Sequence, residues 1–205
     1  MSPPGWPARL AHGEVQVRPL QARDAGAWSE VRIRNEGWLA RWEGRPADAA
    51  PASWRDRHSP VVFAALLRST RREARAGRML PFAVEVGGRL AGQVTVAHVV
   101  RGALDGASVG YWVDQRVAGR GVLPTALALV LDHCFGPVGL HRIEADVRPE
   151  NTASRRVVEK LGFREEGLHL RLLFIDEQWR DHVCYALLRD EVQGGVLAGY
   201  LDRSP

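Results

Sequence analysis

One segment limits the possible folds of this chain more than any other. Residues 107–114 (ASVGYWVD) alternate as a β-strand does, and residues 125–135 (TALALVLDHCF) have the length and apolar character of a helix that Gly136-Pro137 closes. Between them lies Gly119-Arg120-Gly121. Backbone N–H groups at the start of a helix have no intrahelical partner, and together with the helix dipole they bind phosphate. The segment therefore predicts an α/β fold with an anion site where the strand meets the helix.

The glycine turn is compatible with an anion site but does not by itself require one. Gly119 and Gly121 let the backbone approach a ligand without a Cβ clash, and Pro124 suits a first helical turn, where no N–H partner is needed. The turn lacks the GK[ST] of a Walker A motif and does not match a dinucleotide fingerprint. Taken alone, a plain turn explains these residues at least as well.

The other patterns predict a mixed sheet. Strands are predicted at residues 14–20, 82–86, 90–100, 107–114, 143–147, 163–175 and 180–188, with a hairpin turn at Gly87-Gly88. Helices are predicted from Asp24 as N-cap toward Trp42, over 52–76 with a break at Pro60, over 125–135, and from 150–152 to Gly162. This order predicts an α/β (α+β) architecture, a mixed and mostly antiparallel central sheet flanked by helices.

The length of 205 residues fits one domain of ordinary size. We expect a flexible N-terminal leader at 1–13, where Pro3, Pro4 and Pro7 cluster, a single domain at 14–190 and a C-terminal tail at 191–205. No membrane span or signal peptide is predicted, and the two cysteines, Cys134 and Cys184, are expected to be reduced core residues. These features predict a cytoplasmic protein.

The net charge of +4 comes almost entirely from arginine, since Lys160 is the only lysine among 28 basic residues. Arginine suits phosphate-bearing partners because its planar fork binds them bidentately. The basic residues are dispersed and offset by 24 acids, so no direct nucleic-acid binding is expected. The helical row of Arg68, Arg71, Arg72 and Arg75 is interpreted as a solvated face rather than an anion site.

Three motifs change the interpretation of the glycine turn. They are GYWVDQRVAGRG at 110–121, LHRIEADVRPENTASRRVVEKLGF at 140–163 and WRDHVCYAL at 179–187. Together they resemble the GNAT superfamily of acetyl-CoA-dependent N-acetyltransferases, and more narrowly its ribosomal-protein-alanine (RimJ/RimL-type) branch. The resemblance covers roughly residues 14–190. It implies a GNAT-like sheet with splayed strands, acetyl-CoA as cosubstrate and no metal.

The resemblance implies a set of cofactor-binding residues. The family's pyrophosphate loop falls on the glycine turn and its flanks, with Ala118 where Gln or Arg is usual and Leu123 where a small residue is usual. Its members here are Ala118, Gly119, Arg120, Gly121, Val122, Leu123 and Pro124. The pantetheine arm would lie in a gap between strands 107–114 and 143–147, bonded to the backbones of Trp112 and Val113. Asn151 matches a family asparagine near that arm, and it could equally cap the following helix.

The catalytic residues follow from the same resemblance. A tyrosine that serves as the acid in some branches is replaced by Val158, which leaves Ser154 to donate a proton to the thiolate or to hydrogen-bond the sulfur. Asp146 lies where a related branch carries a catalytic glutamate, and it is the first choice for the base. The alternatives for the base are Glu144, Glu85, His98 and Glu43.

The acceptor would be bound by the N-terminal helices. Trp38, Trp42, Glu43 and Trp54 lie where the superfamily builds its acceptor wall, although helix packing explains these residues equally well. The predicted reaction is direct transfer of acetyl to a primary amine, chiefly the N-terminal α-amine of a protein, with a ribosomal protein as the implied target. A small amine such as an antibiotic or polyamine is one alternative acceptor. A non-catalytic acyl-CoA-binding or ribosome-associated module is the alternative of another class, and a homodimer is left open.

Overall fold

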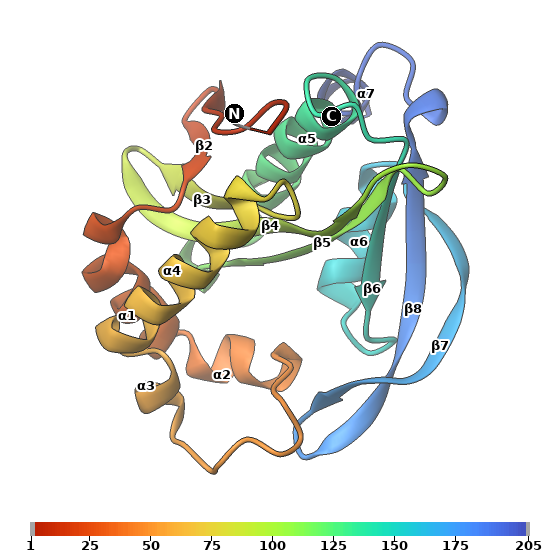
Figure 1. Cartoon of the computed structure of the whole chain (residues 1–205). Coiled ribbons are helices and arrows are strands. Elements are labelled where there is room, and N and C mark those ends of the chain that lie inside the picture. The colour runs from red at the N-terminus through yellow and green to blue at the C-terminus, as the bar shows by residue number, and fades with distance from the viewer. Residues whose placement is uncertain (1–2, 204–205) are drawn as a thin grey trace.

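The computed structural model describes residues 3–203. Its strands form one sheet in the order β1-β2-β3-β4-β5-β6-β8-β7 (Figure 1). The strands are β1 Leu10–His12, β2 Val15–Pro19, β3 Leu80–Val86, β4 Arg89–Val100, β5 Gly106–Val113, β6 Arg142–Val147, β7 Arg164–Ile175 and β8 Gln178–Leu188. Neighbours are antiparallel except β5 and β6, which run parallel. The predicted mixed, mostly antiparallel sheet is confirmed.

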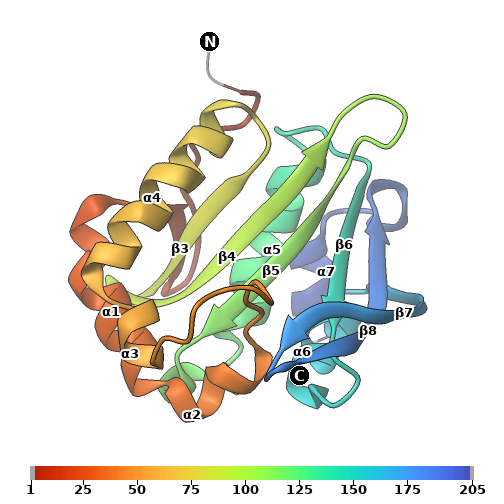
Figure 2. The same ribbon diagram turned by 60° about the horizontal axis from the view of Figure 1, so that its bottom comes forward.

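Helices cover both faces of the sheet (Figures 1 and 2). The helices are α1 Ala25–Arg34, α2 Glu36–Leu39, α3 Trp54–Arg57, α4 Pro60–Arg75, α5 Val122–Phe135, α6 Thr152–Lys160 and α7 Val196–Asp202. The main core lies between the sheet and α5, α6 and α7, with Leu127, Leu131 and Ile143 fully buried. A smaller core under α1 and α4 contains Trp28 and Phe63. Among residues 3–203 no helix is both long and apolar enough to cross a bilayer.

The starts of α4 and α1 show where the local sequence decides a helix start and where it does not. Ser59 accepts a hydrogen bond from Val62 N–H and Pro60 occupies the first turn, so the predicted break at Pro60 is the beginning of α4. Asp24 precedes α1 as predicted, but its side chain makes no capping bond to that helix. The carboxylate instead accepts from buried Arg18, at 2.8 Å, and from Gln21 N–H. A charged partner thus competes successfully with the local capping interaction.

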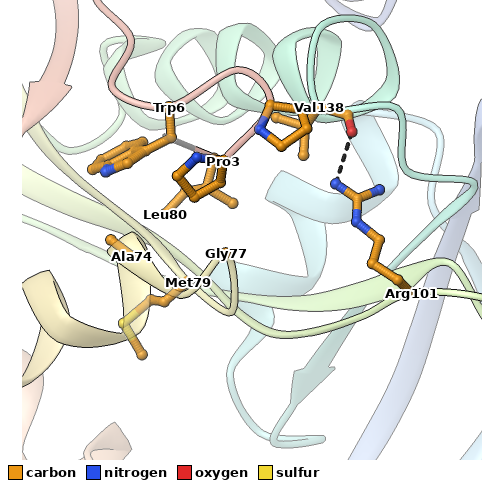
Figure 3. Close-up of a pocket in the computed structure, with 9 residues that line it drawn as sticks. Pro3, Trp6, Ala74, Gly77, Met79, Leu80, Arg101 and Val138 are labelled. Atoms are coloured by element: carbon orange, nitrogen blue, oxygen red, sulfur yellow. Dashed lines mark hydrogen bonds between the residues drawn. The ribbon is translucent and has the colours of Figure 1, made fainter. Parts of the chain in front are cut away.

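The two chain ends differ from their predicted form. Within the expected loose leader, Leu10–His12 pair with β2, and Trp6 packs edge-on against Phe82 at 5.1 Å between ring centroids. His133 Nε2 donates to Gly5 O at 2.6 Å. Beside this contact lies a cavity of about 10 Å³ near Pro3, Trp6 and Val138 (Figure 3), which is space for one water at most. The proline-rich start is therefore packed onto the domain from residue 3.

The expected tail contains α7, which packs on α5. Asp132 of α5 accepts from the N–H groups of Val196 and Leu197, at 2.6 and 3.1 Å, and so caps the first turn of α7. Val196 and Tyr200 are buried against the main core. Residues 1–2 of the leader and 204–205 of the tail lie outside the described part of the chain.

Candidate functional site

The sheet opens at its one parallel pair of strands. β5 and β6 are paired only where residues 106–108 face residues 142–144. Beyond that, β5 continues to Val113 beside β4, while β6 continues to Val147 beside β8. The facing edges of the two strands therefore separate, and their backbone groups are left without a strand partner across the gap. This is the splay that the sequence predicted between 107–114 and 143–147.

The alternation of β5 decides which backbone groups face the gap. Asp114 N–H donates to Ala91 O at 2.7 Å, on the β4 side. Because successive residues of a strand point their N–H and C=O groups to opposite sides, those of Trp112 also face β4. Those of Val113 face the gap, where Val113 O accepts from Trp38 Nε1 at 3.2 Å. The backbone groups of Trp112 are therefore directed to β4 and Val113 N–H is directed into the gap, while the contacts of both residues with a pantetheine arm stay predictions.

The glycine turn presents an uncapped helix start. Gly119 and Gly121 both have a φ of +76°, and α5 begins at the next residue, Val122. Gly121 offers no side chain to cap the helix, so the N–H groups of Val122 and Leu123 have no partner within it. A Cβ on Gly121 would lie 3.2 Å from the hydroxyl oxygen of Tyr200, in α7. The turn is therefore held from one side by α7 and has the donors that a phosphate requires.

A buried carboxylate fixes the start of this turn. Asp114 is 4% exposed and accepts from Arg34 at 2.5 Å and from Asn35 Nδ2 at 2.9 Å, both at the end of α1. Asn35 Oδ1 in turn accepts from Gln115 N–H at 2.9 Å. Burial by itself raises the pKa of Asp114, but the hydrogen bonds from Arg34 and Asn35 outweigh it and hold the pKa below its usual value. This anchor was not predicted, because Asp114 lies 80 and 79 residues from Arg34 and Asn35 in the sequence.

Asn151 and Ser154 lie together at the start of α6. Asn151 Oδ1 accepts from Ser154 N–H at 3.1 Å, so the predicted N-cap is confirmed. The Ser154 hydroxyl is 2.8 Å from the hydroxyl of Tyr111, which comes from β5. Burial raises the pKa of Tyr111 to about 12, so this phenol keeps its proton at neutral pH. A tyrosine hydroxyl thus reaches Ser154 from a different element, although Val158 replaces the tyrosine of the helix itself.

Asp146 belongs to a cluster that spans three strands. Its carboxylate accepts from His169 Nδ1 of β7 at 3.0 Å. Asp146, His169 and buried Cys184 of β8 have their ligand atoms within 4.8 Å of one another, an arrangement that could also hold a metal ion. Burial and the neighbouring Asp146 raise the pKa of the Cys184 thiol to about 11, so it is not a thiolate. His169 was absent from the sequence prediction, because its contact depends on cross-strand register.

The alternative bases are each engaged elsewhere. Glu85 pairs with Arg18 at 2.6 Å, beside β2 and away from the gap. Glu144 pairs with Arg142 at 2.8 Å. His98 contacts Ser108 Oγ through Nδ1 at 3.0 Å. Two of the carboxylates proposed from the sequence contact an imidazole: Glu43 contacts His58, and Asp146 contacts His169 on the face of β6 opposite α5 and α6.

The predicted acceptor wall is largely internal packing. Glu43 is ion-paired with buried Arg32 and lies 3.0 Å from His58 Nε2. Trp54 is 4% exposed and donates through Nε1 to Arg32 O. Arg41 and Arg148 lie over the Trp42 ring, at 5.4 and 5.3 Å from its centroid. Glu43 and Trp42 are thus each engaged by arginines, while the Glu43 side chain is 28% exposed and lines the groove described next, so their role at the acceptor stays a prediction.

A groove of about 360 Å³ lies beside this wall, between α2, residues 40–57 and the β7–β8 turn. Figure 2 shows α2 close to the β7–β8 hairpin, and Gly44 forms a bridge to Ile175 there. The groove has both signs of charge: its acidic residues are Glu36, Glu43, Asp176 and Glu177, and its basic residues are Arg41, Arg45 and Arg57. The groove could accept a polar, extended segment on the α1–α4 side of the sheet.

The network under Glu43 predicts a pH dependence of stability. Burial, reinforced by Arg32, lowers the pKa of His58 to about 4, so the folded protein holds this histidine neutral. The unfolded chain binds the proton at a pKa of about 6.5, so stability is complete above that pH and declines as the pH falls toward 4. We expect a loss of about 2 kcal/mol of unfolding free energy between pH 7 and pH 5 from this residue. Urea denaturation of His58→Gln should lack that loss, whereas exposed His12→Gln should retain it.

Comparison with known proteins places the site in a family. The chain matches the family model of the acetyltransferase (GNAT) domain over residues 14–164. It is 29% identical over 184 residues to the [ribosomal protein uS5]-alanine N-acetyltransferase of Escherichia coli, a match that covers 87% of this chain and 90% of that protein. It is 42% identical over 103 residues to YjcK of Bacillus subtilis, which span 57% of that protein.

The solved structures agree with the sequence matches. Mycobacterium smegmatis RimJ, in complex with CoA-disulfide, has a TM-score of 0.93 and 42% identity, covering 98% of this chain and 96% of that one. The ribosomal-protein-S5-alanine acetyltransferase of Vibrio fischeri has a TM-score of 0.80 and 25% identity, with coverage of 91% and 99%. The splayed sheet and the uncapped glycine turn are thus those of an acetyltransferase, and the chain belongs to the GNAT family of N-acetyltransferases.

Proposed function

We propose that this chain transfers the acetyl group of acetyl-CoA to the N-terminal α-amine of a ribosomal protein in the cytoplasm. The observation that carries the proposal is the gap between β5 and β6, which ends at the uncapped glycine turn. The gap accepts an extended, amide-bearing arm, and the turn accepts a phosphate group. The relatives that cover most of the chain include a uS5-alanine N-acetyltransferase, which favours an alanine N-terminus as acceptor.

The residues of the cofactor side have distinct proposed roles. Val113 N–H is directed at the gap and would bond the arm or the thioester oxygen. The N–H groups of Val122 and Leu123 would hold the pyrophosphate, with exposed Arg120 supplying charge. The side-chain oxygen of Asn151 already accepts a hydrogen bond from Ser154 N–H, so its NH₂ group would donate a hydrogen bond to the pantetheine arm. Ala118 and Leu123 do not prevent this binding, because the turn acts through its backbone.

The leaving group would be protonated from the Ser154–Tyr111 pair. Ser154 Oγ lies at the first turn of α6, and its contact with the neutral Tyr111 hydroxyl gives the serine a proton donor behind it. As the C–S bond breaks, Ser154 would donate to the sulfur. An α-amine has an ordinary pKa of about 8, so part of the acceptor is already unprotonated at neutral pH.

Mass spectrometry tests the proposed function directly. The purified chain is incubated with acetyl-CoA, a mixture of ribosomal proteins and a panel of free amines that includes polyamines and aminoglycosides. We expect one acetyl group on the α-amine of one ribosomal protein and none on internal lysines. Acetylation confined to the free amines would replace the proposed acceptor. Calorimetric binding of acetyl-CoA without transfer to any of them would establish a non-catalytic module instead.

A further inference from the structure

We propose that His169 is the general base that takes the proton from the acceptor amine, and that Asp146 is the residue that positions its ring. The inference rests on the proposed acetyl transfer and deepens it. It replaces the assignment of Asp146 as the base itself. It is carried by the 3.0 Å contact between Asp146 and His169 Nδ1, together with the place of this pair beside the opened strands.

The register of the sheet directs His169 toward the gap. β8 lies between β7 and β6, and on it His182 faces His169 while Cys184 faces Asp146. To reach Asp146, the His169 ring must therefore cross β8, and it passes within 4.8 Å of the Cys184 sulfur. The imidazole consequently extends from the sheet edge toward β6, whose far side borders the gap.

Both members of the pair lie on the face of the sheet that α1 and α4 cover elsewhere, opposite α5 and α6. Ile143, Ala145 and Val147 of β6 are buried in the core with α5 and α6, so the alternating Asp146 projects to the opposite face. The Trp112 side chain is on that same face, where it packs with the α1–α4 core. Asp146 is two residues beyond the last residue of β6 that pairs with β5. The pair thus lies on the α1–α4 face of the sheet, with Asp146 just beyond the point where β5 and β6 separate.

The hydrogen bond prepares His169 for proton transfer. A carboxylate acceptor at Nδ1 keeps the proton on that nitrogen and leaves Nε2 with its lone pair. The structure gives Nε2 no hydrogen-bond partner among residues 3–203, and the His169 side chain is 48% exposed, so an incoming amine has access to it.

The proposed step balances without any further reagent. The amine nitrogen forms the C–N bond to the thioester carbon as His169 Nε2 takes its proton. The C–S bond then breaks, the electron pair remains on sulfur, and Ser154 supplies the proton that completes the thiol. His169 releases its proton to water, and Ser154 regains one from water through Tyr111. The net products are the acetamide and free CoA.

Chemical rescue tests this assignment. The substrate is a short peptide that begins with the N-terminal alanine of ribosomal protein uS5, or the N-terminus that mass spectrometry identifies. His169→Ala should lower kcat about 100-fold, the lower end of the range for a general base, with an unchanged KM for acetyl-CoA. Added imidazole should raise the kcat of His169→Ala about tenfold, because the deleted ring leaves space for it beside Asp146. Asp146→Asn should also lower kcat, but imidazole should not restore it, because that variant keeps its own ring.

Three results would overturn the assignment. The first is full activity of His169→Ala with loss of activity in Asp146→Asn, which would make the carboxylate the base. The second is an imidazole effect of equal size in the unchanged chain and in His169→Ala. The third is loss of rescue when a chelator is present, which would mean that a metal held by Asp146, His169 and Cys184 is responsible. His12→Ala, at an exposed position of β1, serves as the matched control and should behave as the unchanged chain. Absence of transfer by the unchanged chain would instead overturn the proposed function.

Discussion

Gly121→Val is expected to weaken acetyl-CoA binding about 100-fold or more. Valine is strained at the φ of +76°, and its Cβ would meet Tyr200 at 3.2 Å, so the turn must move and withdraw the N–H groups of Val122 and Leu123. Each hydrogen bond to a charged group contributes about 1.5–3 kcal/mol, and two of them correspond to two or more powers of ten in affinity. Isothermal titration calorimetry with acetyl-CoA measures the loss.

Gly139→Val separates the role of the turn from the cost of backbone strain. Gly139 has nearly the same φ, +75°, but a Cβ there meets nothing within 4 Å, and it lies in the connection between α5 and β6. Both variants should lose about 1–2 kcal/mol of stability from the strained conformation. Acetyl-CoA affinity should fall in Gly121→Val alone. Equal affinities of the two variants would remove the glycine turn from the cofactor site.

Asp114→Ala is expected to lower the unfolding free energy by about 2–3 kcal/mol, because it leaves the partners of a buried carboxylate unsatisfied. Arg34 is a quarter exposed and can turn to water, which keeps the loss below that of a fully buried ion pair. The variant also removes the acceptor that orients the Asn35 side chain, and Asn35 in turn fixes the N–H of Gln115 at the start of the glycine turn. The turn should then be less well ordered, and the affinity for acetyl-CoA should fall about tenfold. Chemical denaturation and calorimetry give the two numbers.

Glu30→Ala is the matched control, since Glu30 binds the same arginine. Its carboxylate accepts from Arg34 Nη1 at 2.8 Å, but its side chain is 74% exposed. An exposed pair of this kind contributes about 0.5 kcal/mol or less. Similar losses of unfolding free energy in the Asp114 and Glu30 variants would show that the buried Asp114 carboxylate contributes no more to stability than an exposed ion pair does.

Local patterns predicted most of the fold because each element is decided by its own residues. The alternation of apolar and polar residues over 143–147 matches the alternation of buried and half-buried side chains in β6. Pro60 marks the start of α4. The chain ends escaped prediction for the opposite reason. The prolines near Pro3 and Trp6 predict a loose leader, because nothing in the local sequence stabilises it. Its packing depends on contacts with Phe82 and His133, which are distant in the sequence.

Residue type predicted local backbone geometry at the candidate site better than it predicted side-chain partners. A glycine with positive φ and an asparagine N-cap act through local geometry, so Gly121 and Asn151 could be located from the sequence. The surroundings of Glu43 and Trp42 could not be predicted, because they depend on which arginines reach them: Arg32 from α1, and Arg148 from just beyond β6. His169 was missed for the same reason, since only the strand register brings it to Asp146.

The contact between α7 and the glycine turn has a consequence for synthesis of the protein on the ribosome. During synthesis Gly121 leaves the ribosome long before Tyr200. The glycine turn therefore lacks its contact with α7, the last helix of the described chain, until that helix has been made. Nascent chains that already contain the whole sheet should still bind acetyl-CoA weakly until residues 196–202 have left the exit tunnel. Cofactor binding would then depend on synthesis of α7 and not on the sheet alone.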